Sequence, residues 1–186
     1  MKNVFFIIIL MLFPLGVAAQ ANIGDHLAFM GIPINGTLSE TVRNLQKKGF
    51  VEMKDEVVDE VFDEFSDEYF GLLGKSEDSS LMKGSFYGVS CDITVNANPE
   101  SKNVSCISGG YCNYYTTLLQ AQQPFDRLIR ILSGIYGVGK YTVTNADEKE
   151  YQINNKYGRI ILGIRKIGVA LENEGKYEIR FKFFDE

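Results

Sequence analysis

The stretch between residues 177 and 183 constrains the fold most strongly. Its apolar and charged residues alternate without exception: Tyr177, Ile179, Phe181 and Phe183 against Glu178, Arg180 and Lys182. Because successive side chains of a strand point to opposite faces, this pattern predicts a strand with one buried and one wet face. A weaker alternation over residues 167–171 and a turn at 172–175 predict its hairpin partner. A sheet with one wet face needs helices over the other face, so we expect an α+β fold with an antiparallel sheet.

The best-defined helix lies in residues 31–50, GIPINGTLSETVRNLQKKGF. Thr37 and Glu40 have the spacing of a capping box, in which each side chain bonds the other residue's backbone N–H. The apolar residues that follow recur at helical spacing: Leu38, Val42 and Leu45. Gly49 can adopt the left-handed conformation that ends many helices. Upstream, residues 27–34 predict one short strand that Pro33 confines to an edge or an end.

A similar pattern recurs at residues 123–139, QPFDRLIRILSGIYGVG, with Pro124 in the first turn and Gly137 as the stop. Each helix is followed by sequence that predicts strands: 86–95 and 104–110 after the first, then 141–144 and 159–164 around a polar segment at 147–156. Two interpretations stay open. The chain is either two tandem α–β units, 22–112 and 113–186, or one domain in which the order is coincidental.

The N-terminus predicts export. Residues 1–21 combine an early lysine, an apolar run from Val4 to Leu15 and small residues before two candidate cleavage points. The run is short for a membrane span, and no cysteine follows to carry a lipid anchor. We therefore expect a signal peptide followed by a single α+β domain at 22–186, located in the periplasm or outside the cell.

Three cysteines would enter an oxidising compartment with the exported chain: Cys91, Cys106 and Cys112. If Val95 faces Val104 in a strand pair, or in a register two residues away, Cys91 and Cys106 share a face and can form a disulfide. The alternative is that all three are small buried apolar residues. A thiolate metal site would lack a fourth ligand, because the single histidine, His26, lies far away in the chain.

Residues 54–70 repeat a four-residue unit that begins Asp-Glu, and residues 50–80 carry eleven acidic residues against two lysines. As a helix, this segment would gather its acidic residues on one side. We expect a solvated helix face, or else a surface for a basic partner protein. The candidate contacts are Asp55, Glu56, Asp59, Glu60, Asp63, Glu64, Asp67 and Glu68. The pattern lacks the glycine and final glutamate of a calcium loop, and its negative field disfavours nucleic acid.

The sequence contains no motif for a catalytic or cofactor site. His26 sits just after the predicted cleavage point, and terminal segments hold a catalytic base poorly, so we expect an ordinary surface residue. There is no nucleophile elbow, no zinc-binding His-Glu-x-x-His and no P-loop. We therefore expect no catalytic residue, no metal ligand and no cofactor.

The signature FMGIPINGTLSETVRNLQKKGF, with the later L-x-K-G-x-F-x-G at 81–88 and a helix ending in Tyr136-Gly137, resembles a group of uncharacterised exported proteins of gut Gram-negative bacteria. The order of elements is also similar to the helix-plus-antiparallel-sheet unit of β-lactamase-inhibitory-protein-like domains and of small lipoproteins of outer-membrane assembly. This resemblance implies a tandem α–β unit that binds proteins and brings no catalytic residues. The Asp-Glu repeat departs from the group, and the lipoprotein cysteine is missing.

These patterns predict an exported, non-enzymatic protein-binding module with the acidic helix as its partner surface and a basic protein as the partner. Two alternatives from other classes are a carboxylate-dependent hydrolase and a cell-surface structural or adhesion component. Neither the partner's identity nor the oligomeric state follows from the sequence.

Overall fold

The computed structural model describes residues 22, 23, 25–53, 77–168 and 173–185. The predicted signal peptide, the Asp-Glu repeat and the alternating residues Val169 and Leu171 lie outside the described residues. So do all eight acidic residues expected to form the partner surface.

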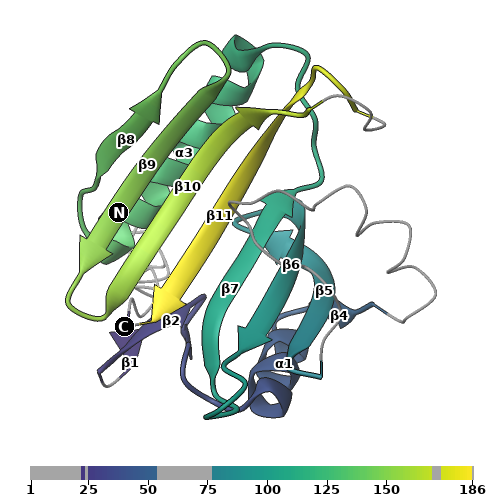
Figure 1. Ribbon diagram of the computed structural model, residues 1–186, viewed down its shortest axis with the longest axis vertical. Coiled ribbons are helices and arrows are strands. Elements are labelled where there is room, and N and C mark those ends of the chain that lie inside the picture. The colour runs from purple at the N-terminus through teal and green to yellow at the C-terminus, as the bar shows by residue number, and fades with distance from the viewer. Residues whose placement is uncertain (1–21, 24, 54–76, 169–172, 186) are drawn as a thin grey trace, which may run out of the picture.

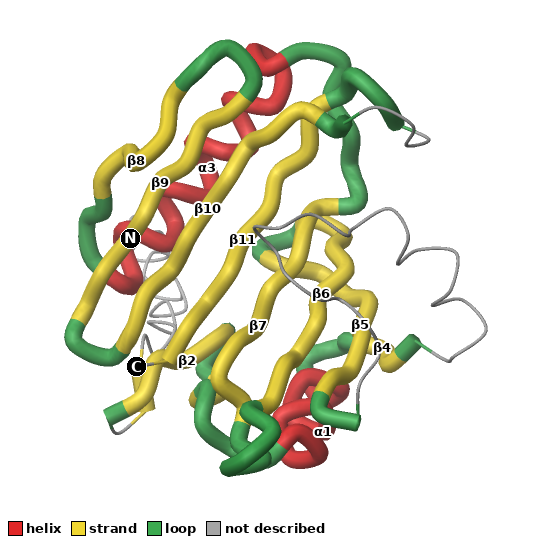
Figure 2. The backbone as a smooth tube through the Cα atoms, in the orientation of Figure 1, coloured by secondary structure: helices red, strands yellow, loops and turns green. Residues whose placement is uncertain are grey.

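The fold is α+β, as expected, and is dominated by one eight-stranded antiparallel sheet in the order β4-β5-β6-β7-β11-β10-β9-β8 (Figure 1). Its strands are β4 (Val51–Glu52), β5 (Ser79–Phe86), β6 (Val89–Ala97), β7 (Val104–Tyr111), β8 (Lys140–Thr144), β9 (Glu148–Asn155), β10 (Gly158–Lys166) and β11 (Tyr177–Asp185). Two described helices, α1 (Leu38–Lys47) and α3 (Leu118–Tyr136), pack on one face. Figure 2 shows both behind the sheet.

Chain order and strand order are linked in a simple way. Helix α1 is followed by β4 to β7, and α3 is followed by β8 to β11. Each set of four strands forms one half of the sheet, and the halves meet where β7 pairs with β11. The last strand of each half therefore lies at the centre of the sheet, and the first strand of each half lies at an edge.

Helix α1 follows its sequence signals closely. Thr37 accepts a hydrogen bond from the backbone N–H of Glu40, while the Glu40 carboxylate accepts from the Thr37 N–H, which confirms the capping box. At the other end Gly49 has a φ of 91°, and the N–H of Phe50 bonds the carbonyl of Leu45. The ring of Phe50 lies so close to Gly84 that a Cβ there would be 2.3 Å from it. The absence of a side chain at Gly84 in β5 therefore leaves room for the Phe50 ring, which follows the end of α1.

Helix α3 is longer than predicted. It begins at Leu118, after the N-cap Thr117 and five residues before the predicted start at Gln123, and it ends at the C-cap Gly137 as expected. Pro124 lies inside the helix, so the expectation of a helix beginning there is wrong. A proline removes one backbone hydrogen bond and costs about 3 kcal/mol in a helix interior. Burial of one continuous face outweighs that cost; its buried residues are Ala121, Phe125, Leu128, Leu132 and Tyr136.

The N-terminal part also differs from the prediction of a single strand. It forms a small sheet of β1 (Asn22–Ile23), β2 (His26–Phe29) and β3 (Ile32–Pro33). The chain reverses at Met30 and Gly31, which have φ values of 52° and 78°. Two successive residues with positive φ make a tight hairpin turn, and only the glycine adopts that conformation without strain.

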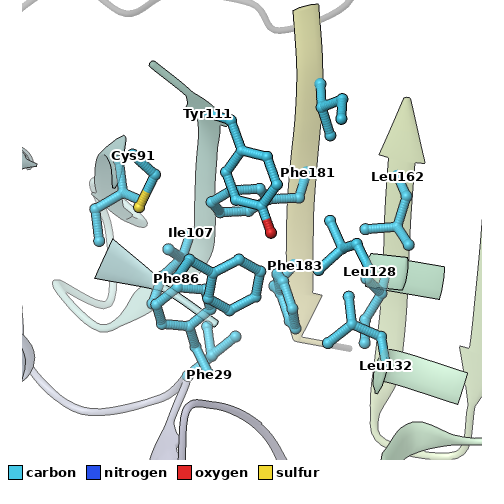
Figure 3. Packing of buried hydrophobic residues seen from close by; sticks show 14 of the residues in the cluster. Phe29, Phe86, Cys91, Ile107, Tyr111, Leu128, Leu132, Leu162, Phe181 and Phe183 are labelled. Carbon is cyan, nitrogen blue, oxygen red and sulfur yellow. The ribbon is translucent and has the colours of Figure 1, made fainter. Parts of the chain in front are cut away.

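Phe29 of this hairpin enters the centre of the main core, where it is fully buried. Its ring stacks on Phe86 at 5.0 Å between centroids and meets Phe183 edge-on at 5.1 Å. Phe86 belongs to one half of the sheet and Phe183 to the other, and Figure 3 shows both beside Phe29. The hairpin thus joins the two halves under the sheet.

The C-terminal half confirms the predicted core residues of β11 and corrects two segments. The hairpin partner of β11 is β10, which ends at Lys166, and not the predicted segment 167–171. Ile179, Phe181 and Phe183 all face the helices and are fully buried. The polar segment at 147–156, expected to connect two strands, is itself mostly strand β9. Only Tyr151 and Ile153 among its residues are apolar and buried, which is too few for a recognisable sequence pattern. Pairing with β10 over eight positions stabilises this strand.

Candidate binding site on the open sheet face

Helices α1 and α3 leave the other side of the sheet, which we call the open face, without a described helix (Figures 1 and 2). The side chains of β9, β10 and β11 that point there are largely charged or polar. Cross-strand register aligns Arg165 with Glu178, Ile161 with Lys182, and Arg159 with Phe184. The open face is therefore a pattern of charges held on rigid strands.

Contrary to the prediction of a wet face, part of this surface is buried. Glu178 is 5% exposed and Arg180 is 4% exposed. The Glu178 carboxylate accepts hydrogen bonds from Arg165 Nε at 2.9 Å and from Arg180 Nη2 at 2.6 Å. Long side chains near the centre of a wide sheet lie across their neighbours, and a buried charge is tolerated only when it is paired. One carboxylate thus holds two guanidinium groups in place.

A second cluster contains two cations on one aromatic ring. The guanidinium carbon of Arg159 lies 4.9 Å from the centre of the Phe184 ring, and Lys182 Nζ lies 4.5 Å from it. Neither cation makes an ion pair with any residue that the structure describes. The Nε of Arg159 is buried and has no hydrogen-bond partner among those residues. Cation–π contact therefore holds both groups without neutralising them.

These clusters line one groove of about 570 Å³ that crosses β8, β9, β10 and β11. Gly163 and Ile161 form part of its floor. The cationic side chains on this face are Arg159, Arg165, Arg180 and Lys182, and the carboxylates are Glu148, Glu150 and the adjacent Glu178. Lys149 also borders the groove, but its ammonium group bonds Gln122 of α3 on the helical face. Four cations against three carboxylates leave a positive balance here, although the whole chain has a net charge of −5.

A hollow of similar size, about 580 Å³, lies beside the start of α1. It is lined by two cations, Arg43 and Lys102, and by three carboxylates, Glu52, Glu77 and Asp78. Lys102 bonds Asp78 at 2.9 Å, and Ser80 donates a hydrogen bond to Glu52 at 2.9 Å. The charge balance of this hollow is therefore negative, opposite to that of the groove on the open face.

The expected disulfide between Cys91 and Cys106 is absent, and both residues are free thiols. Val95 faces Ile107 and not Val104, so Cys91 lies opposite Tyr111 while Cys106 lies opposite Asn96. An irregularity at Asn96 and Ala97 shifts the register near the turn. Cys91 and Cys106 thus point to opposite faces, and no bridge can form between them.

The structure agrees with the alternative prediction for two of the thiols: Cys91 and Cys106 are small buried residues. Burial raises the pKa of Cys91 to about 12 and that of Cys106 to about 11. Cys112, next to the end of β7, is half-buried, and burial raises its pKa as well. All three thiols therefore stay protonated at neutral pH, which makes them poor nucleophiles.

The His26 side chain is 38% exposed, in agreement with the expected surface position, but it has a partner that the sequence did not predict. Its Nδ1 lies 2.6 Å from Asp185 Oδ2, and the other oxygen of Asp185 accepts a hydrogen bond from the Leu27 N–H at 2.7 Å. The contact connects the N-terminal hairpin to the last strand. Neither residue lines the groove.

Two further kinds of feature, a metal site and a membrane-spanning helix, have no candidate in the part of the chain that the structure describes. Those residues include no group of three or more His, Cys, Asp or Glu side chains arranged to hold a metal ion. Among the described helices, none has the length and apolar character needed to cross a bilayer.

Sequence reasoning missed the groove, although it identified some of its residues. Glu178, Arg180 and Lys182 were recognised only as the wet side of a strand. The alternation of β11 was a signal for their common face, but Arg159 and Arg165 reach the same place through strand pairing that a single sequence does not reveal. Comparisons with family models, curated proteins and solved structures found no match for this chain.

Proposed function

We propose that this chain is an exported, non-enzymatic protein-binding module that binds its partner through the open face of the sheet. The observation that carries the proposal is the groove of about 570 Å³, lined by charged side chains on paired strands. Strand-borne side chains are positioned precisely by the sheet, and a concave, charged surface favours recognition of a complementary protein.

Two features of the chain support this role. Among the described elements from α1 onward, one helix followed by four strands occurs twice, which favours a tandem pair of α–β units divided near residue 112. The N-terminal residues 1–21 have the composition of a signal peptide, which favours action in the periplasm or outside the cell. The acidic residues of the Asp-Glu repeat remain candidates for a second contact with a basic region of the partner.

Gly163 offers a direct test, because it lies on the groove floor and a Cβ there would come no closer than 3.9 Å to any other atom. We expect Gly163→Phe to fill the groove while the fold is retained. Capture of partner proteins from a cell-envelope extract, at low and high salt, should be lost in this variant.

Gly134→Phe is the matched control, because Gly134 belongs to α3 in the helical layer and a Cβ added there would meet no atom within 4 Å. It should capture the same proteins as the unmodified chain. Capture that is absent for the unmodified chain at both salt concentrations would refute the proposal, as would equal capture by both glycine variants. The hydrolase and adhesion alternatives stay predictions.

A further inference from the structure

We infer that the cluster Arg159–Phe184–Lys182 binds carboxylate side chains of an acidic polypeptide segment. This inference rests on the proposed function and names the chemistry of the partner. It starts from the contrast between the two charge clusters of the groove. Arg165 and Arg180 share the carboxylate of Glu178, whereas Arg159 and Lys182 make no ion pair with any described residue.

The geometry suits a carboxylate. Arg159 lies opposite Phe184 in the strand pair, and Lys182 lies two residues earlier on the strand and face of Phe184. Arg159 and Lys182 are therefore diagonal neighbours on the two paired strands. Diagonal neighbours lie about 7–8 Å apart, and two side chains as long as these can reach one common ligand over that distance. Both positive groups lie within 5 Å of the centre of the same uncharged ring and repel each other. A carboxylate that reaches both groups from the groove would reduce that repulsion.

Arginine also favours this class of ligand. The guanidinium presents its donors as a planar fork that matches the two oxygens of a carboxylate. Contact with the Phe184 ring restricts the orientation of the Arg159 guanidinium before any ligand arrives. Less conformational entropy is then lost on binding, which increases affinity. The buried Nε of Arg159, which has no partner among the described residues, is one donor available for this bond.

The shape of the groove favours a polypeptide over an isolated small anion. From Phe184 on β11, the groove extends across Ile161 and Gly163 on β10 to Val143 on β8. A volume of about 570 Å³ exceeds that of one carboxylate and accommodates several residues of an extended chain. The positive balance of the groove, within a chain of net charge −5, gives an acidic segment a local target.

The test is binding of a fluorescently labelled oligo-glutamate peptide to the full mature chain, measured by anisotropy at low salt and again at about 0.3 M salt, where screening is stronger. We expect the peptide to bind, with lower affinity at the higher salt concentration. An oligo-lysine peptide should not bind the groove. The double variant Arg159→Gln with Lys182→Gln should lose about tenfold in affinity for each cation removed, the amount expected for one charge-assisted hydrogen bond.

A matched control removes two positive charges elsewhere. Lys47→Gln with Lys48→Gln changes the net charge equally at the exposed end of α1 and should leave oligo-glutamate affinity within about twofold. Circular dichroism checks that both double variants are folded. Equal losses in the two double variants would overturn the inference, because they would show a response to net charge and not to the cluster.

Three other results would also overturn it. One is failure of the unmodified chain to bind oligo-glutamate, and another is inorganic phosphate binding as tightly as the peptide. The third is peptide binding that appears only after the eight acidic residues of the Asp-Glu repeat are changed to amides, since the chain would then supply the carboxylates itself. Capture of an envelope protein that survives in Arg159→Gln with Lys182→Gln would refute this inference and leave the proposed function standing.

Discussion

Truncation of Phe29 tests whether the N-terminal hairpin is an integral part of the core. The ring is fully buried, stacks on Phe86 and meets Phe183 edge-on, so its removal affects both halves of the sheet. Replacing a buried phenylalanine by alanine costs about 3–5 kcal/mol through lost burial and the cavity that remains. Aromatic pairs add about 0.5–1.5 kcal/mol each, so we expect Phe29→Ala to lower the free energy of unfolding by about 4–5 kcal/mol.

The measurement is urea denaturation of residues 22–186, followed by circular dichroism. Because a loss of that size is a large part of a typical domain's stability, a milder variant is needed beside it. Phe29→Leu keeps an apolar side chain in the site and should cost about 1–2 kcal/mol. Leu119→Ala is the control, because Leu119 is a large apolar residue that is 83% exposed and should change stability by less than about 0.5 kcal/mol.

The reasoning would be refuted by a loss below about 2 kcal/mol for Phe29→Ala with an unchanged denaturant slope. That result would mean that the hairpin is separable from the sheet and that the two halves hold together without it. A loss in Leu119→Ala as large as that in Phe29→Ala would equally show that burial does not determine the effect.

Three further predictions follow from the sheet and its buried groups. Glu178→Gln should lower the free energy of unfolding by about 3 kcal/mol in the same urea assay, because the carboxylate that pairs with the buried Arg180 and the half-buried Arg165 is lost. A loss under about 1 kcal/mol would contradict this prediction. Gly109→Ala should lower the free energy of unfolding by more than about 2 kcal/mol, because its Cβ would lie 2.4 Å from a backbone oxygen of β6. Gly134→Ala, at an open position in a helix, should raise the free energy of unfolding by about 0.5–1 kcal/mol. A lower melting temperature for Gly134→Ala than for Gly109→Ala would refute this description of the packing. Burial raises the pKa of Cys91 and Cys106 above the ordinary thiol value of 9.0. The free energy of unfolding should therefore be highest below about pH 8 and should fall at higher pH, because the thiols of the unfolded chain ionise first. An unfolding free energy that stays constant up to about pH 11 would contradict this prediction.

The sequence alone determined those elements whose ends are set by interactions between residues close together in the chain. The capping box of Thr37 and Glu40 and the stop at Gly49 set the limits of α1 because their hydrogen bonds are formed within a few residues. The strict alternation in β11 placed the right residues toward the core for the same reason. From such signals the sequence alone predicted an α+β fold with helices on one side of an antiparallel sheet.

Long-range packing decided what the local patterns left open. Pro124 lies within α3 because the buried face of that helix outweighs the cost of the proline, and β9 is a strand because β10 pairs along its whole length. Strand register, set by contacts between distant segments, separated Cys91 from Cys106. The same pairing brought Arg159 beside Phe184 and Lys182 and so created the groove. Residues far apart in the chain meet only when the sheet forms, and for this reason the tertiary structure alone located the candidate site.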